Sequence, residues 1–167
     1  MDIFIIDKNK VKVPDRKILE RFQYKNFSDA DKLKEHCLSY YLLDKILRDN
    51  YNVENRELEF ISQKPYLKSR EIHFSISHSR NFIAIAISSY NCGIDIEFIK
   101  ERDFVKIAKR MKFEECSSLE NFYKKWTEYE AAYKLNDEYK KIKHYNYENY
   151  MISAVSTSNN EIFQLII

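Results

Sequence analysis

The sequence has few of the residues that mark turns, cross-links and membrane spans. It contains one glycine and two prolines among 167 residues, and its three cysteines are far apart and show no metal-ligand spacing. This pattern favours free thiols in a reducing cytoplasm. No stretch approaches the ~18 apolar residues of a membrane helix, and the short, acidic N-terminal segment is not typical of a signal peptide. We therefore expect a cytoplasmic protein with no membrane partner.

The sequence also lacks a strong charge of either sign. Its 28 Lys and Arg residues nearly balance 26 Asp and Glu residues, giving a formal net charge of +2, and the two signs are interleaved along the chain. Nucleic-acid-binding domains usually carry a basic patch or stripe, so no nucleic-acid partner is expected. No internal repeat or low-complexity linker is visible, and the length predicts a single domain.

The only glycine opens the most informative stretch, Gly93-Ile94-Asp95-Ile96-Glu97. On a strand, side chains two residues apart share a face, so the two acids lie together and the two isoleucines lie opposite. Like charges this close repel, and oxygen ligands favour a hard cation such as Mg²⁺. The stretch therefore predicts a metal site, with glycine as the turn residue that leads into it. The alternative is an edge strand with two solvated acids.

Hydrophobic alternation predicts the other strands. Strands at 72–77, 82–87 and 93–97 are separated by short turns, which predicts an antiparallel meander with the acidic strand third. Apolar runs at 149–155 and 161–167 flank a polar turn and predict a terminal hairpin.

Two long helices are expected, at about 29–49 and about 118–140, because apolar residues recur there every three or four positions. In the second helix, Glu130 lies four residues after Trp126 and four before Lys134, so the three side chains lie along one side. A surface ion pair between Glu130 and Lys134 is one interpretation. If this helix crosses the acidic strand, however, three carboxylates converge, and such a cluster needs a divalent cation.

A histidine among hydroxyls lies at the end of the strand that precedes the acidic one. His78 is flanked by Ser77 and Ser79, and this group is a reasonable set of donors to a phosphate. Lys64, in the preceding loop, could lie nearby. A lone histidine is more often structural or solvated, which is the alternative.

The order and spacing of these stretches resemble the phosphopantetheinyl transferase superfamily, and most closely its larger monomeric type, which activates peptide synthetases and other carrier-protein systems. The matching segments are 64–65, 74–79, 93–97, 107–110 and 126–134. The resemblance covers about residues 60–135. It implies an α+β fold of two pseudo-symmetric halves, about 1–88 and 89–167, each a small antiparallel sheet packed with a long helix.

The resemblance implies a cytoplasmic monomer that transfers 4′-phosphopantetheine from coenzyme A to a serine hydroxyl of an apo acyl or peptidyl carrier protein, releasing adenosine 3′,5′-bisphosphate. Asp95, Glu97 and Glu130 match Mg²⁺ ligands, and Glu130, or a water held by the metal, would take the proton of the serine. Lys134 matches a catalytic lysine that neutralises phosphate. The residues that match coenzyme A contacts are Lys64, Ser77, His78 and Lys134.

Position 129 departs from the pattern of that superfamily. The superfamily usually has lysine immediately before the helix glutamate, whereas this chain has Tyr129. One alternative is therefore a catalytically impaired relative that binds coenzyme A or a carrier protein without transfer. An unrelated metal-dependent phosphohydrolase that uses the same three acids is another.

Overall fold

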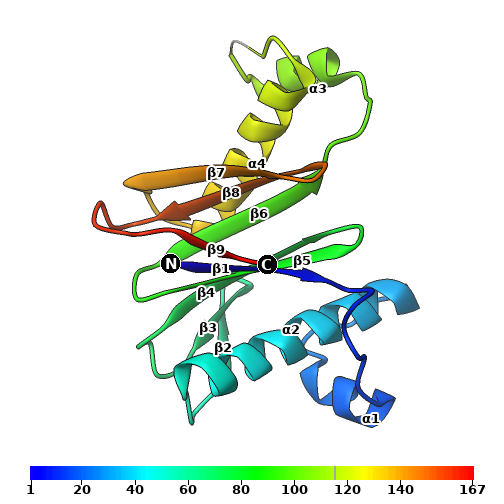
Figure 1. Cartoon of the computed structure of the whole chain (residues 1–167), viewed down its shortest axis with the longest axis vertical. Coiled ribbons are helices and arrows are strands. Elements are labelled where there is room, and N and C mark those ends of the chain that lie inside the picture. The colour runs from blue at the N-terminus through cyan, green and yellow to red at the C-terminus, as the bar shows by residue number, and fades with distance from the viewer. Residues whose placement is uncertain (115) are drawn as a thin grey trace. The chain divides into compact units, whose positions relative to one another are not determined.

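The computed structural model describes residues 1–114 and 116–167. They form two compact units, one of residues 1–8 and 71–167 and the other of residues 9–70. Helices combine with mostly antiparallel sheets, so the predicted α+β class is confirmed (Figure 1). The predicted pseudo-repeat with a boundary near residue 88 stays a prediction.

The smaller unit is built on one long helix and one hairpin. Its elements are α1 (Arg16–Leu19), a 3₁₀ turn (Glu20–Phe22), α2 (Ala30–Tyr51), β2 (Leu58–Ile61) and β3 (Lys64–Leu67). The helix expected at about 29–49 is confirmed as α2. It begins where the Asp29 carboxylate accepts the amide hydrogens of Asp31 and Lys32, and it ends where Asn52 adopts a left-handed conformation.

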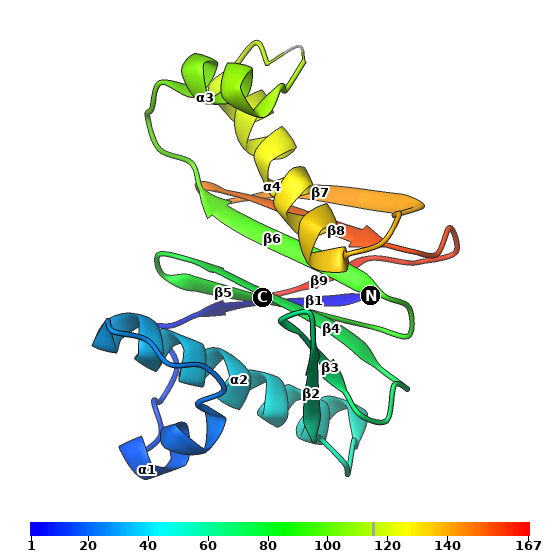
Figure 2. The same cartoon turned by 180° about the vertical axis from the view of Figure 1, so that it is seen from behind.

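The larger unit contains two sheets and two helices. Its elements are β1 (Asp2–Asp7), β4 (His73–Ser79), β5 (Phe82–Ser88), β6 (Cys92–Phe98), α3 (Phe104–Met111), α4 (Leu119–Leu135), β7 (Lys141–Tyr147), β8 (Tyr150–Ser156) and β9 (Gln164–Ile166). One sheet has the strand order β4-β5-β1-β9 and the other β6-β8-β7. Helix α4 packs against β6 and β8, on the face of their sheet that points away from the first sheet (Figures 1 and 2).

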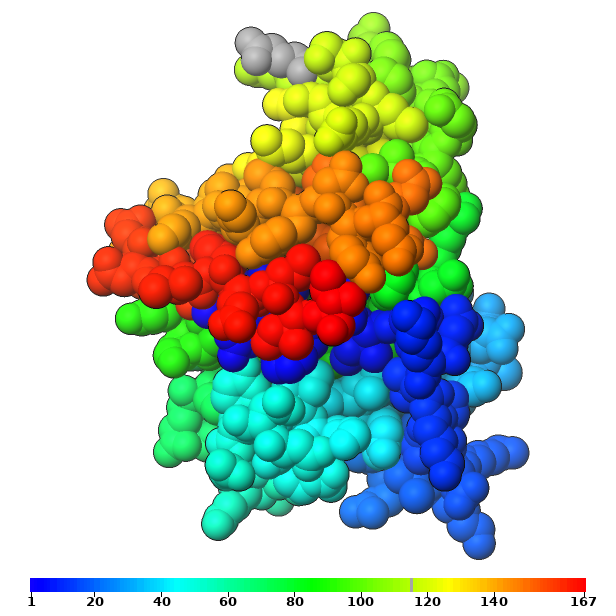
Figure 3. Space-filling model, viewed as in Figure 1, coloured from blue at the N-terminus to red at the C-terminus, as the bar shows by residue number. Residues whose placement is uncertain are grey.

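Strand pairing differs from the prediction in two places. In both, another strand occupies the edge that the predicted pairing needs. β4 and β5 form the expected hairpin, but β1 occupies the other edge of β5, so β6 cannot extend the meander and pairs with β8 instead. The terminal hairpin is also wrong. β8 lies between β6 and β7, and β9 therefore pairs in parallel with β1. Figure 3 shows the C-terminal segment, in red, against the N-terminal strand, in blue.

Helix α4 is shorter than the predicted helix at about 118–140. Ser118 caps its start by accepting the amide hydrogen of Asn121, and Asn136 ends it in a left-handed conformation. The chain then turns into β7, a strand that the periodicity did not predict. No helix in the described parts of the chain is long and apolar enough to cross a membrane.

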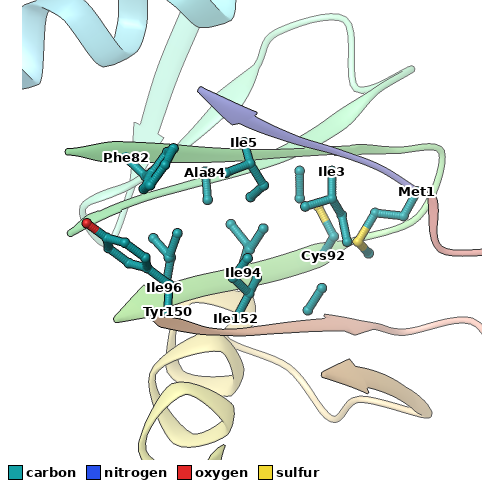
Figure 4. Close-up of a cluster of buried hydrophobic side chains, with 12 residues drawn as sticks. Met1, Ile3, Ile5, Phe82, Ala84, Cys92, Ile94, Ile96, Tyr150 and Ile152 are labelled. Atoms are coloured by element: carbon teal, nitrogen blue, oxygen red, sulfur yellow. The ribbon is translucent and has the colours of Figure 1, made fainter. Parts of the chain in front are cut away.

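The core of the larger unit lies between its two sheets. Ile94 and Ile96 are fully buried there, on the predicted face of β6, and each contributes roughly 1.5–3 kcal/mol by its burial. They pack against side chains of β1, β5 and β8, including Ile3, Phe82 and Ile152 (Figure 4). The opposite face of β6, which carries the two acids, therefore points toward α4.

Gly93 lies inside β6, so its predicted role as a turn residue is wrong. Its φ is not positive. A Cβ atom at this position would overlap the carbonyl oxygen of Ala131 and lie 3.0 Å from the amide nitrogen of Leu135. Glycine is needed because the backbone of α4 passes directly over the strand. This close approach places Glu130 and Lys134 over the acidic face of β6.

Candidate acidic site

In the larger unit, Asp95 of β6 forms an ion pair with Lys134 of α4. The Nζ atom of Lys134 donates a hydrogen bond to Asp95 Oδ1 at 2.7 Å and another to the carbonyl oxygen of Ile94 at 3.2 Å. Asp95 is only 5% exposed. The alternative of two solvated acids is therefore wrong for this residue, although β6 is an edge strand of its sheet.

Two serines of β4 also contact the acids. Ser77 donates to the same Oδ1 atom of Asp95 at 2.7 Å, and Ser79 donates to Glu97 Oε2 at 3.1 Å. Asp95 thus receives two donors on one carboxylate oxygen. Both acids are therefore held from the side of β4, and Asp95 is also held from α4 by Lys134.

The second carboxylate oxygen of Asp95 is different. Asp95 Oδ2 is buried and has no hydrogen-bond partner among the described residues. Buried polar atoms are nearly always hydrogen-bonded, and leaving one unsatisfied costs roughly 1–3 kcal/mol, more for a charged group. This oxygen can therefore accept a further donor or bind a cation.

Glu97 and Glu130 lie within electrostatic range of Asp95. Burial raises the pKa of each glutamate, and the negative charge of Asp95 raises both pKa values further. The positive charge of Lys134 lowers both pKa values without cancelling the rise. Burial and the neighbouring charge of Asp95 therefore disfavour the charged forms of both glutamates, and Lys134 offsets this only in part.

No group of three or more His, Cys, Asp or Glu side chains in residues 1–114 and 116–167 is already arranged as a metal cage. The chemistry of the donors nevertheless fits a hard divalent cation. All three candidates, Asp95, Glu97 and Glu130, offer oxygen, one of these oxygens is buried without a partner, and burial together with the charge of Asp95 disfavours the charged forms of both glutamates. The ligand set stays a prediction.

Arg102 was not predicted near the site. Its guanidinium group lies over the rings of Phe122 and Tyr123, with centroid distances of 5.8 and 5.7 Å. Its positive charge lowers the pKa of Glu97, and its Nε atom is buried without a hydrogen-bond partner among the described residues. No sequence pattern indicated it, because a single arginine in a loop after a strand belongs to no periodic pattern.

A second polar network fastens α4 to the β6-β8-β7 sheet. Ser153, which pairs with Asp95 across the strands, bonds to Thr127 at 2.6 Å and to His144 Nδ1 at 2.8 Å. His144 Nε2 lies 3.7 Å from Glu128, and burial lowers the pKa of this histidine. The order serine, histidine, glutamate suggests a nucleophilic triad. Ser153 is fully buried, however, so no substrate reaches its hydroxyl and the network is structural.

Comparison with known proteins gives one informative relative. No family model matches the sequence. The chain is similar to a phosphopantetheinyl transferase. It is 34% identical over 117 residues to the 4′-phosphopantetheinyl transferase gsp of Aneurinibacillus migulanus. The match covers 63% of this chain and 48% of that protein, so the chain spans about half the length of the curated relative that it matches.

The predicted coenzyme A contacts are not all at the acidic site. Ser77 and His78 are neighbours on β4, and their side chains therefore point to opposite faces of the strand. Ser77 is buried against Asp95, whereas His78 is exposed. Lys64 belongs to the smaller unit, where its ammonium group lies 5.2 Å from the centre of the Tyr66 ring. Their contacts with coenzyme A stay predictions.

Tyr129, which stands where the transferase superfamily usually has lysine, lies on a different side of α4 from Lys134. It is 47% exposed and contacts Phe113 edge-on, with a centroid distance of 6.1 Å. Together with Lys125 and Tyr139, these rings line a hollow of about 450 Å³. The tyrosine is therefore accommodated without disturbing the contact between Lys134 and Asp95.

Proposed function

We propose that the chain is a Mg²⁺-dependent 4′-phosphopantetheinyl transferase that acts on coenzyme A and an apo carrier protein. The observation that carries this proposal is the acidic site. Asp95 is buried with one unpartnered oxygen, and burial together with the charge of Asp95 raises the pKa of Glu97 and of Glu130. The similarity to the Aneurinibacillus migulanus transferase supports the same reaction.

Asp95, Glu97 and Glu130 are the residues that would hold the metal ion. When bound, Mg²⁺ neutralises the charge of the pyrophosphate and the charge that develops during transfer. These roles use only the oxygen ligands that a hard cation prefers. Lys134, which lies on Asp95 in the structure, provides a further positive charge for a phosphate oxygen.

The transfer moves the 4′-phosphopantetheinyl group from coenzyme A to the carrier protein. The serine oxygen of the carrier protein bonds to the phosphorus next to pantetheine, the bond from that phosphorus to the bridging oxygen breaks, and adenosine 3′,5′-bisphosphate leaves. Glu130 accepts the proton of the serine at its carboxylate. Lys64, Ser77 and His78 bind coenzyme A, and the protein acts as a cytoplasmic monomer.

The direct test is incubation with coenzyme A, Mg²⁺ and a panel of apo carrier proteins, followed by intact-mass measurement. A carrier should gain the mass of phosphopantetheine. Asp95→Asn should slow the transfer about 1,000-fold, in line with the loss of a main electrostatic group. Glu138→Gln, which neutralises an exposed acid beyond the end of α4, is the matched control. Equal labelling by the wild type and Asp95→Asn would show that the metal assignment is wrong.

The alternative of a relative that binds without transferring rests on Tyr129. It predicts heat on titration with coenzyme A and no mass gain on any carrier protein. Release of phosphate from small substrates without a protein acceptor would instead indicate a metal-dependent phosphohydrolase.

A further inference from the structure

Three serines of β4 face the open edge of β6. Ser75, Ser77 and Ser79 are two residues apart and share one face of their strand. β6 has a sheet neighbour on only one side, so the amides on its other edge need partners from elsewhere. Each serine oxygen accepts a hydrogen bond from one of these amides. The amide of Ile94 donates to Ser75 at 3.1 Å, the amide of Ile96 donates to Ser77 at 3.4 Å, and the amide of Phe98 donates to Ser79 at 3.0 Å.

A hydroxyl that accepts an amide can still donate its own hydrogen, and here the three serines differ. Ser77 donates to Asp95 at 2.7 Å and Ser79 donates to Glu97 at 3.1 Å. The equivalent position of β6 beside Ser75 is Gly93, which offers no side chain. All three serines therefore tie β4 to β6, but only two of them touch an acid of the candidate metal site.

We propose that Ser79 and Ser77 are positioning residues that orient Glu97 and Asp95 toward a divalent cation. The inference rests on the metal site of the proposed function. Each hydroxyl fixes one oxygen of its carboxylate and thereby directs the other. For Asp95, the fixed atom is Oδ1 and the atom without a partner is Oδ2.

The purely structural interpretation is that these serines only satisfy the edge of β6. All three serines accept an amide of β6, whereas only Ser77 and Ser79 also donate to a carboxylate. Hydrogen bonds that orient metal ligands typically contribute 10- to 100-fold in metal affinity. Ser75 therefore serves as a control within the same strand, with the same kind of bond to the same edge.

The experiment compares Ser75→Ala, Ser77→Ala and Ser79→Ala with the wild type. Mn²⁺ binding is measured from the electron paramagnetic resonance signal of the unbound ion, with Mg²⁺ as competitor, and thermal unfolding is followed separately. All three variants should unfold at lower temperature, because each loses one bond to an amide of β6. Only Ser77→Ala and Ser79→Ala should bind Mn²⁺ more weakly, by about 10-fold or more.

Two further variants of position 79 guard against loss of the fold. Ser79→Thr keeps the hydroxyl and should bind Mn²⁺ like the wild type, whereas Ser79→Val, which has the same shape as Ser79→Thr but no hydroxyl, should show the loss. Equal Mn²⁺ affinity in the three alanine variants would overturn the inference alone. A wild type that binds no Mn²⁺ would overturn the metal site of the proposed function, and this inference with it.

Discussion

Glu161 and Asp95 are both buried carboxylates of the larger unit, each 5% exposed, but their oxygens are satisfied very differently. Glu161 accepts from the N-terminal ammonium group of Met1 on one oxygen and from Ser88 and Ser156 on the other. Asp95 receives both of its donors on Oδ1 and leaves Oδ2 without one among the described residues. An acid that only holds the fold together uses both oxygens internally, whereas the acid of the candidate site keeps one available.

The electrostatic consequences also differ. Burial alone would raise the pKa of Glu161, but the hydrogen bonds from its three donors outweigh it and the pKa is lowered. At the acidic site, burial and the charge of Asp95 together leave the pKa values of Glu97 and Glu130 raised. The first carboxylate therefore stabilises the folded protein as an anion, whereas burial and the charge of Asp95 disfavour the charged forms of Glu97 and Glu130, and a bound cation would relieve this.

The largest effect on stability is expected for Gly93→Ala. Its methyl group would overlap the carbonyl oxygen of Ala131 and force α4 away from β6. The free energy of unfolding should fall by about 3 kcal/mol, a typical cost of overpacking, and urea denaturation would measure it. The comparison between the two carboxylate sites predicts that Mn²⁺ affinity falls as well, since Lys134 and Glu130 move with the helix. Unchanged unfolding would contradict the proposed reason for the only glycine.

Glu161→Gln should lower the free energy of unfolding at pH 7 by about 2 kcal/mol, because buried donors lose a charged acceptor. Its effect on Mn²⁺ affinity should be negligible. This variant separates the two kinds of acid, since a loss of metal affinity would show that Glu161 is coupled to the acidic site after all.

The same variant predicts a pH dependence. Because the pKa of Glu161 is lowered from its ordinary value of 4.5 in the folded protein, its stabilising contribution is present above that value and is lost as the pH falls through the folded pKa. The difference in stability between the wild type and Glu161→Gln should therefore shrink below about pH 4.5. Urea denaturation at a series of pH values would measure it, and a constant difference would contradict the assignment.

The smallest effect is expected for Glu97→Gln in protein freed of metal by a chelator. Removal of a partly buried charge that Asp95 also repels should raise the free energy of unfolding by about 1 kcal/mol. The same change should weaken Mn²⁺ binding, so stability and metal affinity would move in opposite directions. A loss of stability would mean that the bonds of Glu97 to its neighbours, and not repulsion, dominate at this site.

The sequence by itself determined the local structure of the site. Alternation placed Ile94 and Ile96 in the core and the two acids on the opposite face, and the three- and four-residue spacing placed α2 and most of α4. These features depend on neighbours along the chain, so periodicity is sufficient to predict them. The spacing of the β4 serines was visible too, and only their match with the acids of β6 was not.

Tertiary structure alone decided which edges the strands share and which groups meet across them. β6 does not belong to the predicted meander, because β4 and β1 occupy both edges of β5. The open edge of β6 instead faces the β4 serines. The bond from Lys134 to Asp95 and the position of Arg102 follow from the same packing. Strand pairing depends on which strand edges are free in the folded protein, and this cannot be read from any local pattern in the sequence.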